Sequence, residues 1–263
     1  MAVSYAIIGG TGVYDPKILT DTREEKVHTN YGDVVVKVGS YHGKEIAFLP
    51  RHGAKHSVPP HLINYRANIS ALKQLGVTKI LATAAVGSLN PAMLPGDFVL
   101  VDQFMDFTKN RAATFFEGGS QGVVHIDLTE PYCKELRGVM KTAAGQLGLR
   151  LSEGGNYVCT EGPRFETPAE IRMYRMLGGD LVGMTSCPEV ALSREAEMCY
   201  ATVAMVTNFA AGISPTCLTH SEVVETMRQN GEKLRQLVMK TMELITEERS
   251  CACQAALKEL GMF

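Results

Sequence analysis

The sequence predicts a single α/β domain built around a largely parallel β-sheet. The chain has 263 residues, of which 45% are hydrophobic and 21% charged, values that suit one sizeable globular domain. A run with helical spacing at 61–75 lies between two apolar, strand-like runs, and this strand–helix–strand order indicates parallel pairing. A further apolar run at 203–206 leads through a polar loop into a long helix, a layout that places ligands at the carboxyl ends of strands.

Charge, hydropathy and cysteine usage narrow the class of protein. The formal net charge of -2 disfavours a nucleic-acid surface, and no apolar run approaches the ~20 residues of a membrane span. The N-terminal residues lack the basic region of a signal peptide. The chain has seven cysteines scattered along its length, a pattern that does not indicate a secreted disulfide framework. We therefore expect a cytoplasmic protein without a nucleic-acid or membrane partner.

The first strand-like run, 4–8, is followed at once by the glycine-rich segment 9–12. Three glycines around Thr11 allow a tight fold that aims backbone N–H groups at an anion. The G-x-G-x-x-G spacing of a dinucleotide loop is not met. We favour a phosphate nest in which Thr11 donates from its hydroxyl, and an ordinary tight turn remains the alternative.

Two short runs at 34–38 and 46–49 indicate a β-hairpin whose second strand ends at Arg51 and His52. The planar fork of donors on an arginine suits an anion clamp, and a solvated basic loop is the alternative. The histidines that follow, His56 and His61, do not have zinc-ligand spacing, and the chain has no HExxH or paired CxxC. We predict no metal.

The central part of the chain alternates helices and strands. After the helix at 61–75, the strand at 77–83 runs into small residues at 84–88 that would let a ligand approach the backbone. The segment 102–127 is polar and irregular, and a loop this long usually has a function or lies at an interface. A helix is expected at 131–147.

A second polar loop, 161–168, follows the strand at 156–160 and precedes a helix at 169–177. It contains Phe165 and Glu166, and an aromatic ring beside a carboxylate could stack on and hydrogen-bond a flat heterocycle. The alternative is that Phe165 belongs to the core and that Glu166 interacts with the dipole of the helix.

Two further strand ends fall at the same edge of the predicted sheet. One places Met184 and Thr185 there, before a helix at 190–197. The other is the run at 203–206, which stops at Thr207 and Asn208.

The last helix is predicted at 222–248, with the pattern Thr219-x-x-Glu222 as its capping box and His220 at its start. Residues 1–248 would form the domain and 249–263 a C-terminal tail. The tail contains Cys251 and Cys253. These could form a redox pair or a stabilising disulfide, but we favour unpaired thiols on a mobile tail.

Six motifs occur in order: GGTG, PRHG, AAVGSLNP, EGPRFET, GMTSCPE and TNFAAGIS. Together they resemble the purine nucleoside phosphorylase family over roughly residues 3–245, and more narrowly its methylthioadenosine phosphorylase branch. The resemblance implies a single-domain phosphorylase fold, a central, mixed, partly closed sheet flanked by helices, and a homotrimer. It also implies phosphorolysis, in which phosphate attacks the anomeric carbon and releases the purine. Inorganic phosphate is then a co-substrate, and no cofactor is expected.

The resemblance assigns roles motif by motif, with His52 and Asn208 as the expected catalytic residues. The phosphate site would consist of Thr11, Arg51, His52, Ala84, Ala85 and Thr185. Ala84 stands where the methylthioadenosine enzymes carry a threonine, so this site loses a hydroxyl. The substrate site would consist of Phe165, Glu166, Met184, Asn208, Phe209 and Ala210.

Base specificity is where the chain departs from that branch. Asn208 and Ala210 replace two aspartates, and Glu166 stands where the branch typically has serine and the 6-oxopurine phosphorylases have glutamate. An amide can accept a hydrogen bond from protonated N7 with its carbonyl and donate one to O6 with its N–H, and a carboxylate can accept one from N1–H. We therefore predict phosphorolysis of inosine and guanosine, in purine salvage.

His220 is expected to decide the 5′ substituent, because histidine can bind a hydroxyl whereas a methylthio group needs an apolar residue. Thr167 is the other expected specificity position, and His125 could reach a neighbouring subunit's 5′ pocket. Three alternatives remain open: an S-methyl-5′-thioinosine (or methylthioadenosine) phosphorylase, a His220 that only caps its helix, and a nucleoside-binding protein that has lost catalysis.

Overall fold

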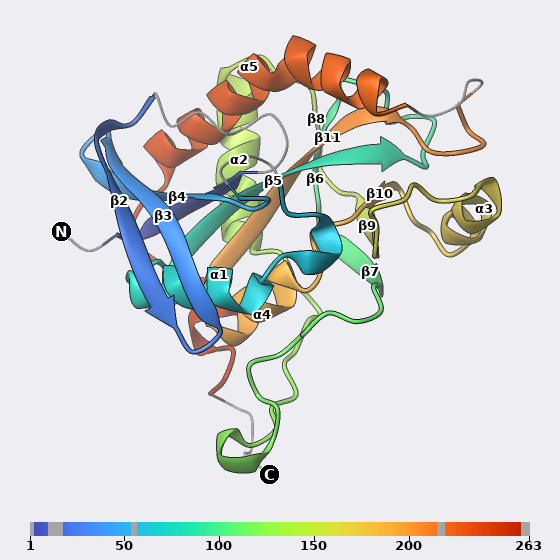
Figure 1. Ribbon diagram of the computed structural model, residues 1–263. Helices are drawn as coiled ribbons and strands as arrows, with labels where there is room; N and C mark the ends of the chain where they lie inside the picture. Colours follow the sequence, from blue (N-terminus) through green and yellow to red (C-terminus); the bar gives the residue numbers. More distant parts are fainter. Residues whose placement is uncertain (1–2, 10–17, 54–56, 215–218, 259–263) are drawn as a thin grey trace.

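The computed structural model describes residues 3–9, 18–53, 57–214 and 219–258. Within them, one mixed sheet of eleven strands forms the centre of the molecule (Figure 1). Its main path runs in the order β2 (Thr20–Thr29), β3 (Gly32–Tyr41), β4 (Lys44–Pro50), β1 (Tyr5–Gly9), β5 (Lys79–Ser88), β10 (Leu181–Gly183), β9 (Asn156–Thr160) and β7 (Gln103–Phe107). A branch adds β11 (Cys199–Phe209), β6 (Phe98–Leu100) and β8 (Leu151–Ser152).

Strand β5 is the axis of this sheet, because it pairs with three other strands. Its first half lies parallel to β1, its last two residues lie antiparallel to β10, and β11 runs parallel to it along its whole length. A sheet that branches in this way curls on itself and is partly closed. The carboxyl ends of β4, β1, β5 and β11 consequently lie at one edge.

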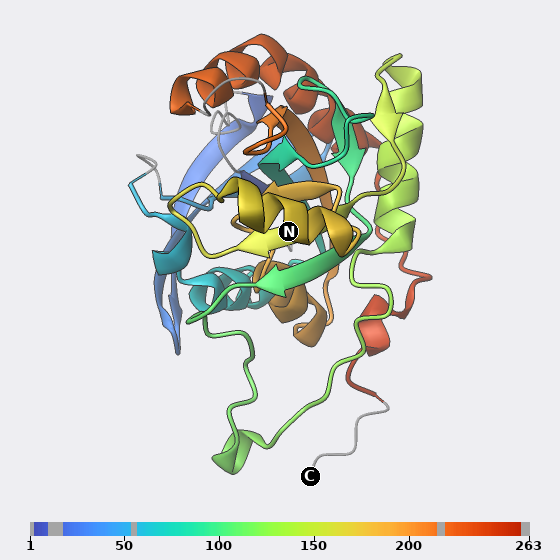
Figure 2. The same cartoon turned by 90° about the vertical axis from the view of Figure 1, so that its right-hand side faces the viewer.

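Helices cover both faces of the sheet (Figures 1 and 2). One face packs against α1 (Tyr65–Gln74) and α4 (Glu189–Glu195), and the other packs against α2 (Lys134–Gln146) and α5 (His220–Leu244). Successive residues of β11 alternate between the two cores, with Met205 in one and Ala204 and Val206 in the other. A strand covered on both faces is apolar throughout, which explains the unbroken run in the sequence.

The helix α3 (Pro168–Met176) lies at the far edge, where it packs on β9 and β10. Its N-cap residue is Thr167, which forms a capping box with Glu170. The N-cap predicted for α5 is also present, because the Thr219 hydroxyl accepts a hydrogen bond from the Glu222 N–H at 3.2 Å.

Three predictions of secondary structure need correction. The helix predicted at 61–75 is α-helical only over Tyr65–Gln74, because Pro59 and Pro60 lead first into a 3-10 turn. The segment 102–127 is not irregular throughout, since its first residues form β7 beside β9. The helix predicted at 131–147 spans Lys134–Gln146.

The described part of the C-terminal tail, 249–258, contains a short 3-10 helix, Ala252–Ala255, and packs against the domain. Cys253 is only 4% exposed and belongs to the same core as α2 and α5. The expectation that its thiol lies on a mobile tail is therefore wrong. None of the described helices is both long enough and apolar enough to cross a membrane.

Candidate active site

A cavity of about 380 Å³ opens at the carboxyl edge of the sheet, around the second half of β5. Its walls come from the ends of β4, β5, β10 and β11, from the loop before α3, and from the start of α5. The predicted site residues that line it are Arg51, His52, Ala84, Ala85, Phe165, Glu166, Met184, Thr185, Asn208 and Ala210. These residues come from five places in the sequence: the ends of β4, β10 and β11, the second half of β5 and the loop before α3. The parallel strands bring their carboxyl ends to this edge, and β10 reaches it running antiparallel to β5.

Two glycines let the walls approach closely. A Cβ on Gly183 would lie 2.1 Å from the Tyr157 hydroxyl, and one on Gly162 would lie 2.6 Å from the Met184 sulfur. Gly162 also has a φ of +68°, which L side chains rarely adopt. A larger residue would therefore push against the Tyr157 ring at position 183, and against the Met184 side chain at position 162.

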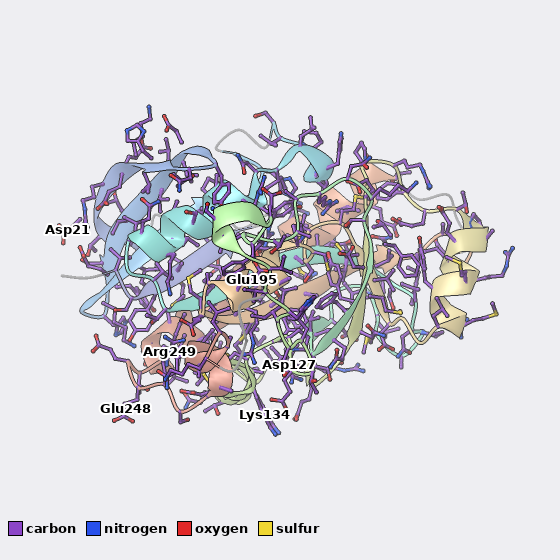
Figure 3. All side chains as sticks on the ribbon, turned by 90° about the horizontal axis from the view of Figure 1, so that it is seen from below. Asp21, Asp127, Lys134, Glu195, Glu248 and Arg249 are labelled. Atoms are coloured by element: carbon purple, nitrogen blue, oxygen red, sulfur yellow. The ribbon has the colours of Figure 1, made fainter. Side chains whose placement is uncertain are left out.

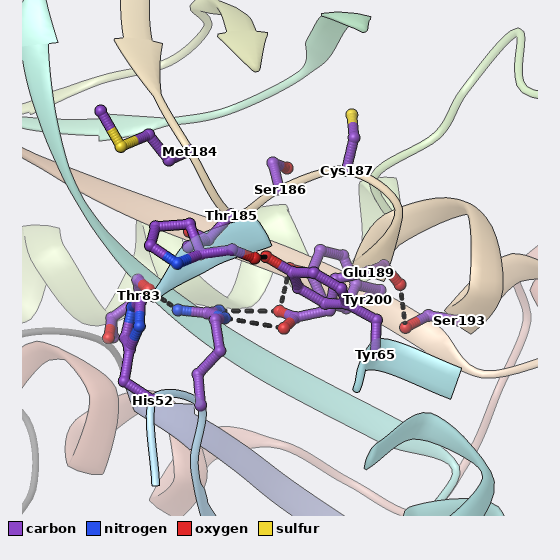
Figure 4. A network of polar contacts seen from close by, with 12 residues as sticks. His52, Tyr65, Thr83, Met184, Thr185, Ser186, Cys187, Glu189, Ser193 and Tyr200 are labelled. Carbon is purple, nitrogen blue, oxygen red and sulfur yellow. Dashed lines mark hydrogen bonds and ion pairs between the residues drawn. The ribbon is translucent and has the colours of Figure 1, made fainter. Parts of the chain in front are cut away.

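Arg51 is held by Glu189, which lies at the start of α4 (Figure 4). The Arg51 Nε and Nη2 atoms donate to the two carboxylate oxygens of Glu189, both at 2.7 Å, and Nη1 donates to the Thr83 carbonyl at 2.9 Å. The Tyr200 hydroxyl donates to the same carboxylate at 2.7 Å. These bonds use three of the five guanidinium N–H groups, so two remain for an anion in the cavity.

Burial sets the electrostatics of this pair, whose side chains are 2% and 0% exposed. Burial alone would lower the pKa of Arg51, but the charge and hydrogen bonds of Glu189 raise it above the ordinary arginine value. Burial also raises the pKa of Tyr200, so its hydroxyl stays protonated as a donor. The cavity therefore keeps a fixed cation on its floor at any working pH.

His52 follows Arg51 and is 7% exposed. Its Nδ1 lies 2.9 Å from the Val58 carbonyl. Because a carbonyl can only accept, Nδ1 carries the proton in the neutral ring, which fixes the tautomer and the ring orientation. Thr185 lies across the cavity, and its backbone N–H donates to the Tyr157 hydroxyl at 3.3 Å.

The other end of the cavity carries a carboxylate and an amide. Glu166 accepts a hydrogen bond from the Thr160 hydroxyl at 2.6 Å, and burial raises the pKa of its carboxyl. The Asn208 oxygen lies 2.8 Å from the Thr207 hydroxyl, and its Nδ2 donates to the Phe209 carbonyl at 2.9 Å. One N–H and one lone pair of the Asn208 amide are left for a ligand.

A single arginine supports two walls of the cavity from behind. Arg111, in the loop after β7, donates to the carbonyls of Met184, Cys187, Thr160 and Glu161 at 2.6–3.1 Å. Its side chain is 2% exposed. Burial alone would lower the pKa of Arg111, but neighbouring groups, Tyr65 first among them, raise it. The long loop thus has the structural function that its length indicated.

The remaining predicted residues lie elsewhere or cannot be placed. Thr167 caps α3 and does not line the cavity, Phe209 is absent from the lining residues, and His125 is exposed in the long loop. Thr11 and the side chain of His220 lie outside the described residues.

Both alternatives for the loop before α3 are excluded by its position. Phe165 is 41% exposed at the rim of the cavity and is not a core residue. Glu166 precedes α3, and the acidic residue in the first turn is Glu170.

Sequence reasoning missed four residues that position the predicted ones: Thr160, Glu189, Thr207 and Arg111. Glu189 lies 138 residues from Arg51 along the chain, and the partners of Arg111 are 46–76 residues away. Only Thr207 had a local signal, as the first polar residue after the apolar run at 203–206.

The comparisons with known proteins agree with this architecture. The family model described as "Phosphorylase superfamily" matches residues 4–243. The chain is 62% identical to a probable 6-oxopurine nucleoside phosphorylase of Moorella thermoacetica, covering 95% of this chain and 96% of that protein. It is 58% identical to the 6-oxopurine nucleoside phosphorylase of Pyrococcus furiosus, with coverages of 96% and 97%.

Among solved structures, a methylthioadenosine phosphorylase from an antarctic soil metagenomic library superimposes with a TM-score of 0.92. It shares 36% identity and covers 98% of this chain and 92% of its own. A family match over almost the whole domain, joined by relatives at 58–62% identity, leaves one conclusion. The chain belongs to the phosphorylase superfamily, among its purine nucleoside phosphorylases.

Proposed function

We propose that this protein cleaves 6-oxopurine nucleosides, inosine and guanosine, by phosphorolysis to the free base and ribose 1-phosphate. The observation that carries the proposal is the chemical division of one cavity. Arg51 and Thr185 offer donors to an anion, with His52 beside them, whereas Glu166 and Asn208 offer an acceptor and a mixed amide to a base. Relatives at 58–62% identity carry the same activity in their names.

The chemistry needs charge stabilisation at both ends of the breaking bond. Cleavage builds positive charge on the ribosyl ring and negative charge on the leaving purine. A phosphate dianion held by Arg51 beside His52 would supply the nucleophile and would face the ribosyl cation. Asn208 would stabilise the purine by accepting a hydrogen bond from protonated N7, and its fixed orientation by Thr207 removes the need to reorganise during the reaction.

Selectivity for a 6-oxo base follows from which donors and acceptors remain. The remaining N–H of Asn208 can donate to O6, and the Glu166 carboxylate can accept from N1–H. Adenine presents the opposite pattern, with a donor at position 6 and an acceptor at N1. A site built on specific hydrogen bonds can reject such an analogue by a factor of ~10⁴.

A second candidate substrate is methylthioinosine, and one observation favours it. Val223, in the first turn of α5, contributes an apolar surface to the cavity, as a methylthio group would require. His220 begins the same helix, and a 5′-hydroxyl partner at that position would favour ordinary nucleosides.

Phosphate-dependent release of base from inosine, guanosine, adenosine and methylthioinosine, measured side by side, tests the proposal. We expect turnover of inosine and guanosine, none without phosphate, and at most trace turnover of adenosine. Faster turnover of methylthioinosine would leave the preference for a 6-oxopurine base standing. It would show that the 5′ substituent is a methylthio group and not a hydroxyl. Comparable turnover of adenosine would overturn the roles of Asn208 and Glu166, and binding without turnover would indicate a nucleoside-binding protein.

We further propose a homotrimer, the assembly that the six motifs imply, in which His125 reaches the 5′ pocket of a neighbour. Light scattering should then give three times the 28.6 kDa mass of the chain. A monomeric mass with full activity would remove His125 from the site.

A further inference from the structure

Four cysteines meet at the opposite end of β11 from the cavity. Cys133 is the N-cap residue of α2, Cys199 begins β11, and Cys251 and Cys253 come from the segment after α5. Their sulfur atoms all lie within 4.8 Å of one another, and those of Cys199 and Cys251 are 3.3 Å apart. Every cysteine in the described part of the chain is a free thiol.

The segment that brings Cys251 and Cys253 to the cluster is tied to the domain on both sides. The Glu135 carboxylate, in the first turn of α2, accepts hydrogen bonds from the N–H groups of Ser250 and Cys251, both at 3.2 Å. Arg249 donates to the Glu197 carbonyl. Figure 3 shows Glu248 and Arg249 at the same end of the molecule as Lys134, and Figure 2 shows the segment in red below α2.

The surroundings of the sulfur atoms favour negative charge. Arg194 is 9% exposed and donates from Nη1 to the Cys253 sulfur at 3.2 Å. Cys133, Cys199 and Cys253 are buried, and Cys251 is partly buried.

We propose that Cys133, Cys199, Cys251 and Cys253 form a closed structural site for a thiophilic divalent cation, foremost Zn²⁺. A Zn–S bond of about 2.3 Å in tetrahedral geometry sets sulfur atoms about 3.8 Å apart, a value within the observed 3.3–4.8 Å. One M²⁺ displaces four thiol protons and leaves a complex of charge −2, which the Arg194 guanidinium partly balances.

The site has four protein ligands and no open position, so its function is structural rather than catalytic. It also lies far from the chemistry. Cys199 and Asn208 begin and end the same strand, and nine residues at ~3.3 Å each separate them by about 30 Å. The bound cation would fasten the C-terminal segment to the base of the sheet, joining α2, β11 and the chain after α5.

Metal analysis of the full-length, tag-free protein purified under reducing conditions tests this proposal. We expect about one zinc per chain, released in parallel with the modification of four thiols by a mercurial reagent. After removal of zinc, Co²⁺ should give the intense visible absorption of a tetrahedral four-thiolate complex. Neither result depends on a variant that might fail to fold.

Matched variants locate the site. Cys251→Ser and Cys253→Ser should each weaken the affinity for zinc by more than about tenfold, the least that even the loss of an outer-shell partner typically costs. Cys159→Ser, which alters a buried cysteine outside the cluster, should keep the full metal content.

Two results would overturn the proposal. One is a reduced protein that takes up neither zinc nor cobalt. The other is a mass, measured after free thiols have been blocked, that shows two or four of these cysteines unmodified and the chain lighter by one hydrogen for each of them. This result would mean that the sulfur atoms form disulfides instead.

Discussion

The two ends of β11 carry polar and sulfur-containing groups of opposite character. At the carboxyl end, Asn208 and its neighbours keep hydrogen-bonding capacity that points into a cavity of about 380 Å³. At the amino end, Cys199 lies against other cysteine sulfurs, and the four sulfur atoms are all within 4.8 Å of one another. The comparison teaches that polar side chains facing a cavity stay available to a ligand. Side chains that contact one another instead join segments of the chain.

The largest effect should come from breaking the ion pair under the cavity. Glu189→Ala leaves the Arg51 charge buried without its partner, which typically costs ~3–5 kcal/mol of unfolding free energy. Denaturant unfolding measures this loss. Arg51→Met combined with Glu189→Leu should recover part of the stability while phosphorolysis stays lost. A single variant as stable as the parent would contradict the role of this pair.

The next largest effect concerns Asn208, at the carboxyl end of β11. Asn208→Ala removes the hydrogen bond that stabilises the leaving purine, and kcat for inosine should fall by ~10²–10³. Asn208→Asp should also lose inosine turnover and gain on adenosine relative to inosine, because a carboxylate accepts from a 6-amino group. Steady-state kinetics on both nucleosides checks this, and an unchanged substrate ratio in Asn208→Asp would remove Asn208 from base recognition.

A smaller effect concerns pH. Burial raises the pKa of Glu166, and the protonated carboxyl is a weaker acceptor for N1–H than the carboxylate is. The kcat/KM for inosine should therefore fall as the pH drops through this raised value, earlier than the ordinary glutamate pKa of ~4.3 would give.

Glu166→Gln should lower kcat/KM by about tenfold at neutral pH, the scale of one hydrogen bond, and should remove that acidic limb. Glu170→Gln is the matched control, because Arg164 and neighbouring hydrogen bonds lower the pKa of Glu170 to about 2. An acidic limb that persists in Glu166→Gln would show that another group titrates.

The smallest effect on activity should come from the cysteine end. Cys253→Ser should change kcat and KM for inosine by less than about twofold, because the cluster lies about 30 Å from Asn208. The melting temperature should nevertheless fall by several degrees, since a ~1–2 kcal/mol loss has that effect in a chain of this size. A large loss of kcat at a temperature where the variant stays folded would contradict this prediction and show that the cysteine cluster and the cavity are functionally coupled.

Much of the cavity could be predicted because local patterns carry it. An apolar run that stops at a polar residue fixes where a strand ends, and parallel pairing brings such ends together. Arg51 and Asn208 come from the parallel strands β4 and β11 and line one cavity, whereas Thr185 reaches it from β10, which runs antiparallel to β5. The motifs also indicated a base-binding pair, although they gave no sign that Thr160 and Thr207 would orient it.

What could not be predicted depends on contacts between distant segments. Glu189 lies 138 residues from Arg51 along the chain, and its burial becomes meaningful only once α4 is packed. The cysteine cluster draws on three segments, so neither the CxC pair nor the zinc spacings sought in the sequence revealed it. Thr167 lies in a conspicuous motif, yet its hydroxyl serves the helix cap.

The irregularity between Val206 and Asn208 has an evolutionary consequence. In the ladder with β5, Val206 pairs with Val86 and Asn208 with Gly87, so Thr207 is an extra residue in the strand. Loss of one codon would restore an unbroken ladder without disturbing the register below it. The same deletion would remove the hydroxyl that orients Asn208. Deletion of this one codon would thus give a protein that folds but does not cleave nucleosides. A lineage no longer under selection for this activity can lose it in that single step.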